Sequence, residues 1–141
     1  MVKTYVDTGV LIEAYRSAGP LAGATIAILS DPNRAFVTSE FVRLEVLPKP
    51  TYYRRLDEVA FYNAFFAGAL PPVGITRRLV RLATQRAETF GLSAVDALHV
   101  AAAEIGGADE LVTAERPTSP LARVTTLRVT SIHPAPAPPT P

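Results

Sequence analysis

Four acidic residues lie where predicted strands and helices meet, and together they could hold a divalent cation. Asp7 follows the short apolar run that ends at Val6, and helical spacing begins directly after it. Glu115 also follows a short apolar strand, whereas Asp96 lies in the first turn of a helix and Glu45 lies between apolar positions of another. In a parallel sheet, residues at such junctions converge on the crevice beyond the carboxyl ends of the strands. Their repulsion is costly unless a cation is bound, and Mg²⁺ suits one or two carboxylates plus water.

Each of these acids also has an ordinary structural interpretation, which the sequence leaves open. Asp7 could serve only as the N-cap of the first helix. Asp96 stands three residues after a serine, which is the spacing of a capping box, and the helix dipole favours a carboxylate there. Glu45 could be the partner of a nearby arginine such as Arg43 or Arg16.

The spacing of apolar residues and the positions of Gly, Pro and capping residues predict strands that alternate with helices. Predicted helices begin after Asp7 and occupy residues 21–29, 40–47, 51–67, 77–90 and 93–105. Predicted strands end at Val6 and occupy residues 35–38, 110–113 and 126–132, with one more short strand among residues 70–75. This alternation predicts an α/β fold, a three-layer sandwich with a mostly parallel central sheet flanked by helices.

Length and composition bound the class of protein. The chain of 141 residues has room for one domain with a real core, which we place at residues 1–132. Residues 133–141 are rich in proline and predict an extended tail. With 48% hydrophobic residues, 19% charged residues and a mean hydropathy of +0.20, the chain is globular and has no membrane-spanning run. Without a recognisable secretory signal, we expect a soluble, cytoplasmic protein.

The residue types that the chain lacks exclude several kinds of site. It has no cysteine, which excludes disulfides, thiolate zinc sites and a cysteine nucleophile, and its two histidines are too few for an imidazole cage. Neither G-x-G-x-x-G nor G-x-x-x-x-G-K-[ST] occurs. A phosphatase with an Asp nucleophile would carry a second Asp at position 9, which is Gly9 here. Any metal must therefore be held by oxygen ligands.

Four motifs in a fixed order resemble those of the PIN-domain ribonucleases, which include the toxins of VapC-type toxin-antitoxin pairs. They are V-D-T-G near the start, S-E-F-V-R-L-E some thirty residues later, S-A-V-D-A-L-H-V-A-A-A late in the chain and L-V-T-A-E after that. The resemblance covers residues 2–132. Its most specific parts are V-D-T and the D-A-L-H-V-A-A-A helix.

The resemblance implies an endoribonuclease that depends on Mg²⁺ or Mn²⁺. Asp7, Glu45 and Asp96 would be the catalytic acids that hold the metal, and Thr8 and Thr113 would support them. The resemblance also implies RNA as substrate, a possible antitoxin partner and a homodimer. The motif places a histidine on the helix of Asp96, which we interpret as an ordinary helix residue outside catalysis.

The chain departs from the family pattern at the fourth acid. The family usually has T-x-D or T-x-N there, whereas this chain has Glu115, and T-S-P replaces a further Asp. We expect Glu115 to act as the fourth catalytic acid, with one or two metal ions left open. Outward-facing Arg77, Arg78 and Arg81 are expected to contact RNA. Two alternatives are a PIN-fold module that binds RNA or protein with weak or no cleavage, and a small α/β module whose acids are caps and ion pairs.

Overall fold

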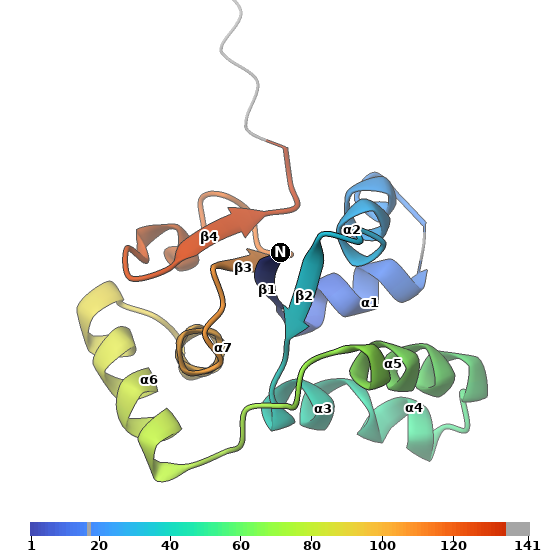
Figure 1. Ribbon diagram of the computed structural model, residues 1–141, viewed down its shortest axis with the longest axis horizontal. Coiled ribbons are helices and arrows are strands. Elements are labelled where there is room, and N and C mark those ends of the chain that lie inside the picture. Colours follow the sequence, from blue (N-terminus) through green and yellow to red (C-terminus); the bar gives the residue numbers. More distant parts are fainter. Residues whose placement is uncertain (17, 135–141) are drawn as a thin grey trace, which may run out of the picture.

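The computed structural model describes residues 1–16 and 18–134, which form a central sheet surrounded by helices (Figure 1). The described elements, in chain order, are β1 (Val2–Val6), α1 (Thr8–Arg16), α2 (Ala22–Leu29), β2 (Arg34–Val37), α3 (Glu40–Val46), α4 (Pro48–Tyr52), α5 (Leu56–Gly68), α6 (Arg77–Phe90), α7 (Ala94–Ile105), β3 (Glu110–Thr113), the 3-10 helix η1 (Pro120–Arg123) and β4 (Arg128–Ser131).

The sheet has four strands in the order β2-β1-β3-β4, and every neighbouring pair is parallel. Figure 1 shows α1 and α2 on one side of this sheet. On the other side lies α7, with α6 farther from the sheet. The predicted three-layer α/β sandwich is therefore confirmed. Parallel sheets usually have helices on both faces, and their buried strands therefore tend to be short apolar runs.

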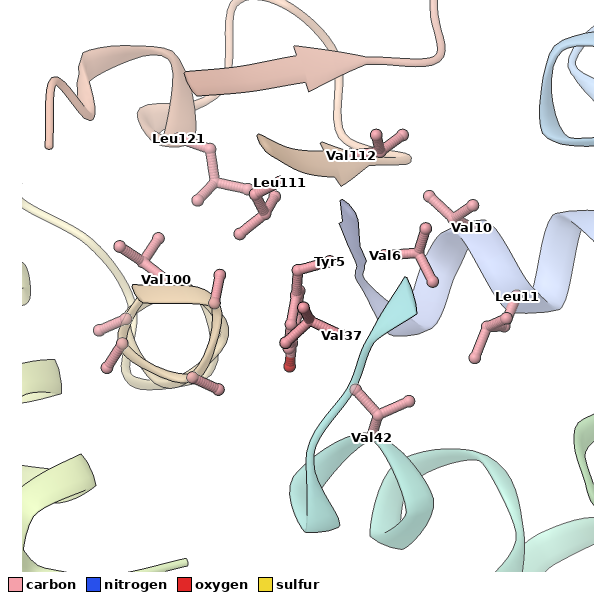
Figure 2. Packing of buried hydrophobic residues seen from close by; sticks show 14 of the residues in the cluster. Tyr5, Val6, Val10, Leu11, Val37, Val42, Val100, Leu111, Val112 and Leu121 are labelled. Atoms are coloured by element: carbon pink, nitrogen blue, oxygen red, sulfur yellow. The ribbon is translucent and has the colours of Figure 1, made fainter. Parts of the chain in front are cut away.

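The core consists of two apolar layers, one on each face of the sheet (Figure 2). Successive strand residues point to opposite faces, so Tyr5 and Leu111 point toward α7 while Val6 and Val112 point toward α1. All four side chains are fully buried, at 0% exposure, and burying each such side chain contributes about 1.5–3 kcal/mol. The strand ends, and the residues that follow them, are thus fixed by packing on both sides.

The strand order creates a crevice at one particular point of the sheet. From β1 the chain first adds β2 on one side and later adds β3 on the other, so the direction of winding reverses at β1. Ligands of open parallel sheets bind at such a reversal, beyond the carboxyl ends of the strands. Here those ends carry Asp7 after β1 and Thr113 at the end of β3.

The predicted helix at 51–67 is wrong, because the structure contains α4 and α5 with a turn between them. The preceding helix α3 ends at Val46, and Pro48 then begins α4 in its first turn, where a missing N–H costs nothing. Arg54 then adopts a left-handed φ of 54°. The N–H of Arg55 donates to the Pro50 carbonyl at 2.8 Å and that of Arg54 to Thr51 at 3.2 Å, which is the Schellman pattern that ends a helix.

The predicted short strand among residues 70–75 is reduced to a single bridge between Val73 and Ser39. The segment still lies along the outer edge of β2, because Leu70 N–H donates to Phe36 and Val73 N–H donates to Thr38, both at 2.9 Å. Consecutive prolines at 71 and 72 supply no N–H, which explains why no longer ladder forms.

The other predicted elements differ from those observed by two residues or fewer at each end. The single domain at 1–132 stays a prediction, and residues 135–141 of the predicted tail lie outside the described residues. None of the helices within residues 1–16 and 18–134 has the length and apolar character needed to cross a membrane.

We predict that Gly106→Ala destabilises the fold, because Gly106 at the end of α7 lies tightly against β2. An added Cβ would overlap Val37 Cγ1 and lie 3.1 Å from Val73 Cγ2, and the short buried side chain of Val37 cannot swing away. Overpacking of this kind costs about 1–3 kcal/mol. Denaturant unfolding measures it, with Gly68→Ala in α5 as the control, since its Cβ would meet nothing within 4 Å. Equal stability of both variants would contradict the tight packing.

Candidate active site

All four acids predicted from the sequence line one pocket of about 330 Å³ at the carboxyl end of the sheet. Its residues come from α1, α3, α7 and the segments that follow β1 and β3. The lining residues are Asp7, Thr8, Gly9, Glu45, Val95, Asp96, His99, Ala114 and Glu115. We call this the acidic pocket. Carboxylates from four separate parts of the chain therefore converge, as the positions at strand and helix ends predicted.

Asp7 is both a helix cap and a wall of the acidic pocket. Its Oδ1 accepts hydrogen bonds from the N–H of Val10 at 3.1 Å and of Ala114 at 3.4 Å, and its Oδ2 accepts from the Thr113 hydroxyl at 2.5 Å. Asp7 is only 8% exposed. Burial raises its pKa, although the hydrogen bond from Thr113 opposes that effect.

Asp96 likewise combines a capping position with a place in the pocket. Its N–H donates to the Ser93 hydroxyl at 3.2 Å, so the predicted cap by Ser93 is present. Burial raises the pKa of Asp96, and so do the nearby negative charges of Glu115 and Glu45. Like charges close enough to disturb each other's titration are what a bound cation would neutralise.

Glu45 has different partners from those considered in the sequence. No ion pair joins it to Arg43 or Arg16 within the described residues; instead its Oε1 accepts from the Thr8 hydroxyl at 2.6 Å and lies 2.9 Å from His99 Nε2. Burial alone would raise the pKa of Glu45, but these hydrogen bonds and the charge of His99 together lower it. The alternative interpretation of Glu45 as the partner of Arg43 or Arg16 is therefore not supported.

A buried hydrogen-bond chain runs from Glu45 into the core. His99 Nδ1 lies 2.8 Å from the Tyr5 hydroxyl, which lies 2.9 Å from the Ser39 hydroxyl. The Glu45 carboxylate can only accept, so His99 Nε2 donates to it. In the neutral ring Nδ1 then accepts from Tyr5, and Ser39 donates to the Tyr5 oxygen. Burial raises the pKa of Tyr5 far above its usual value, which keeps its proton available for this chain.

His99 is the site residue that sequence reasoning set aside. It is 4% exposed, packs against the rings of Tyr5 and Phe41 with centroids 5.7 and 5.1 Å away, and lines the acidic pocket. The only signal in the sequence was its place one turn after Asp96, on the same helical face. Because His99 touches Glu45, it acts as a positioning residue for that carboxylate.

The remaining predicted residues divide into two groups. Thr8 lines the acidic pocket, Thr113 stands directly behind Asp7, and exposed Glu115 is joined to Thr113 through its backbone N–H at 2.9 Å. By contrast, the exposed arginines of α6 are absent from the pocket lining: Arg77, Arg78 and Arg81. Their contact with RNA stays a prediction.

The donor set of the acidic pocket fits a hard divalent cation in its chemistry. All of its charged ligands are carboxylates, and two of them have pKa values raised by burial. Within residues 1–16 and 18–134, no group of three or more acidic or imidazole side chains is already arranged to enclose an ion. Mg²⁺ needs only one or two direct carboxylates and keeps several waters, so an open arrangement of this kind suits it.

Comparison of the sequence with protein families gives one decisive match. The model of the PIN domain matches residues 4–122, which is most of the chain and includes every residue of the acidic pocket. The chain belongs to the PIN domain family. A search of curated proteins found no match for this PIN domain.

Several solved structures share the fold of this PIN domain. A toxin-antitoxin complex from Klebsiella pneumoniae has a TM-score of 0.67 at 18% identity, covering 92% of this chain and 98% of that one. VapBC2 from Rickettsia felis, bound to a DNA fragment from its promoter, has a TM-score of 0.68 at 14% identity with the same coverage. VapC20 from Mycobacterium tuberculosis, a Sarcin-Ricin loop cleaving toxin, has a TM-score of 0.59 at 20% identity, covering 84% and 93%. At these identities the likeness shows the fold alone.

We predict that Asp7→Asn stabilises the PIN domain in EDTA at neutral pH, by on the order of 1 kcal/mol. Asn caps a helix about as well as Asp, so the cap is retained while the buried charge is removed. Because burial raises the pKa of Asp7 in the folded protein, protonation of Asp7 favours the folded state. This stabilisation is fully present below about pH 3.9 and is lost as the pH rises through the raised pKa.

The gain from Asp7→Asn should therefore be largest at neutral pH and should shrink as the pH falls toward about 3.9. Thermal melts of the wild type and the variant across this range, all in EDTA, measure it. A stability difference that does not change with pH would show that the Asp7 charge carries no cost.

Proposed function

We propose that this PIN domain is a metal-dependent endoribonuclease and acts as the toxin of a toxin-antitoxin pair in the cytoplasm. The observation that carries the proposal is the convergence of Asp7, Glu45, Asp96 and Glu115 on one pocket at the reversal point of the sheet. The fold it shares with VapC20, described as a Sarcin-Ricin loop cleaving toxin, supports the choice of RNA. The toxin-antitoxin complexes of the same fold support an antitoxin partner, and a homodimer is part of the proposal.

In this proposal the metal ligands are Asp7, Glu45 and Asp96, and the ion is Mg²⁺ or Mn²⁺. Such an ion, when bound, supplies activation of water and stabilisation of negative charge on the phosphoryl group. The protein holds the ligands in place beforehand. Thr113 and two backbone N–H groups fix both oxygens of Asp7, and Thr8 and His99 fix one oxygen of Glu45.

Glu45 and Glu40 provide a matched pair on helix α3 for testing the proposal. Glu45 lines the acidic pocket, whereas Glu40 is exposed outside its lining. Glu45→Gln should lower Mn²⁺-dependent cleavage of single-stranded RNA by at least about 10- to 100-fold, the loss typical when a metal site is disturbed. Glu40→Gln should cut as the wild type does. RNA fragments are resolved on gels, with EDTA as the metal-free control. Full activity of Glu45→Gln would contradict the assignment of Glu45 as a metal ligand.

Metal binding can be measured without cleavage through protein stability. Mn²⁺ should raise the melting temperature of the wild type, because a ligand at a hundred times its dissociation constant stabilises by about 2.7 kcal/mol. Asp7→Asn should gain much less. Failure of Mn²⁺ to stabilise wild type would favour the alternative in which the acids serve only as caps, whereas binding without cleavage would favour a PIN-fold binding module.

Glu115 is predicted to be a fourth acid of lesser weight. It is exposed at the rim and raises the pKa of Asp96 through its charge, so it lies close enough to share the ion. Glu115→Asp should keep or improve Mn²⁺-dependent cleavage, because the family pattern has the shorter acid, whereas Glu115→Ala should reduce it. Cleavage rates of the two variants decide the point, and unchanged activity in Glu115→Ala would remove the residue from the site.

A further inference from the structure

A second pocket adjoins the acidic pocket, and its charged residues are three cations and the two carboxylates of Glu45 and Glu58. It has a volume of about 340 Å³ and shares Glu45 with the acidic pocket. Its lining includes Arg16, Lys49 and Arg55. Within the described residues, Arg16 and Lys49 form no ion pair, and Arg55 makes one weak contact of 3.8 Å while its side chain stays 66% exposed. This basic pocket therefore offers free positive charge directly beside the acidic pocket.

Two exposed aromatic rings lie beside Arg55, which lines the basic pocket. The guanidinium of Arg55 lies over the Tyr53 ring at 5.7 Å, and the rings of Tyr52 and Tyr53 meet edge to face at 4.9 Å. Tyr52 is 79% exposed and Tyr53 is 62% exposed. Large aromatic side chains are rarely left this open without a partner. Tyr52 is the last residue of α4, and Tyr53 follows it in the turn that leads to α5.

Hydrogen bonds hold the backbone of the turn in a defined conformation. Arg54 is the one non-glycine residue with positive φ among the described residues, and the Schellman hydrogen bonds to Pro50 and Thr51 fix the backbone around it. Because the backbone is already ordered, a ligand that packs on Tyr52 and Tyr53 meets a preformed surface and loses less conformational entropy on binding.

We infer that this turn, together with the basic pocket, binds single-stranded RNA and leads it to the acidic pocket. Stacking platforms for single strands combine exposed aromatic rings with cations that follow the phosphates, and both are present here along one path that ends at Glu45. The assignment rests on the proposed RNA substrate and specifies that it is unpaired. Paired bases are stacked inside a duplex and cannot lie on the tyrosines.

We call Tyr52, Tyr53 and the basic pocket the platform, which is separate from the arginines of α6. Figure 1 shows α4 and α5 on the opposite side of the molecule from α6. Loss of binding on changing the turn therefore cannot be caused by a disturbance of Arg77, Arg78 or Arg81.

The test measures RNA binding in EDTA, so that cleavage plays no part. A short single strand with a fluorescent base analogue should be quenched on binding, and Tyr52→Ala or Tyr53→Ala should weaken binding by about 5- to 150-fold. The Phe variants should bind as the wild type does, because they keep the ring. Leu56→Ala is the control, since it removes a 75% exposed apolar side chain at the start of α5, directly after the turn.

Charge is tested separately by salt dependence. Arg55→Ala should reduce the slope of log affinity against log salt by about 0.7 for a single strand. Arg128→Ala, which removes an exposed arginine on β4, should leave the slope unchanged. Wild-type affinity in both Tyr→Ala variants, or equal binding of a matched duplex, would overturn the inference and leave the turn as a surface for a protein partner.

The platform and the nuclease can fail independently. If wild type binds single strands through the tyrosines but does not cut RNA in Mn²⁺, the proposed function fails while the platform stands. If wild type cuts and both Tyr→Ala variants bind and cut normally, the platform fails while the nuclease stands.

Discussion

The structure depends on a carboxylate held in a place where water cannot fully solvate it. Asp7 directly follows β1, and its two oxygens accept hydrogen bonds from donors in α1 and at the end of β3. These hydrogen bonds tie the first helix and the third strand to the same point. They offset part of the cost of burying the charge, and the cost that is left makes the pocket attractive to a cation.

The carboxylate of Glu45 is held by a chain of hydrogen bonds that reaches into the core. Glu45 receives its hydrogen bond from His99 on α7, and behind His99 stand Tyr5 of β1 and Ser39 at the start of α3. Residues from strand β1, helix α7 and the start of α3 thus determine where one oxygen lies. A buried network of this kind fixes geometry when every member has a partner, as is the case here.

The sequence predicts the layout of the fold and the positions of the acids, because both follow from local patterns. Asp7 and Glu115 follow apolar strands, and the place of Asp96 follows from its cap. The partner of Glu45 could not be predicted, since His99 lies 54 residues away and meets it only through the packing of α7 on β1. The α4–α5 turn was missed because a left-handed arginine carries none of the signal that glycine would give.

The parallel order of the sheet has a consequence for how the pocket forms. The hydrogen bond between Thr113 and Asp7 joins residues 106 positions apart, and β1 meets β3 only after the helices α1 to α7 and strand β2 have intervened in the chain. Such distant pairing is slow compared with the closure of local contacts. During translation, Asp7 is synthesised long before β3, the strand that completes its surroundings. The acidic pocket of a growing chain is consequently incomplete until β3 has been made and has paired with β1.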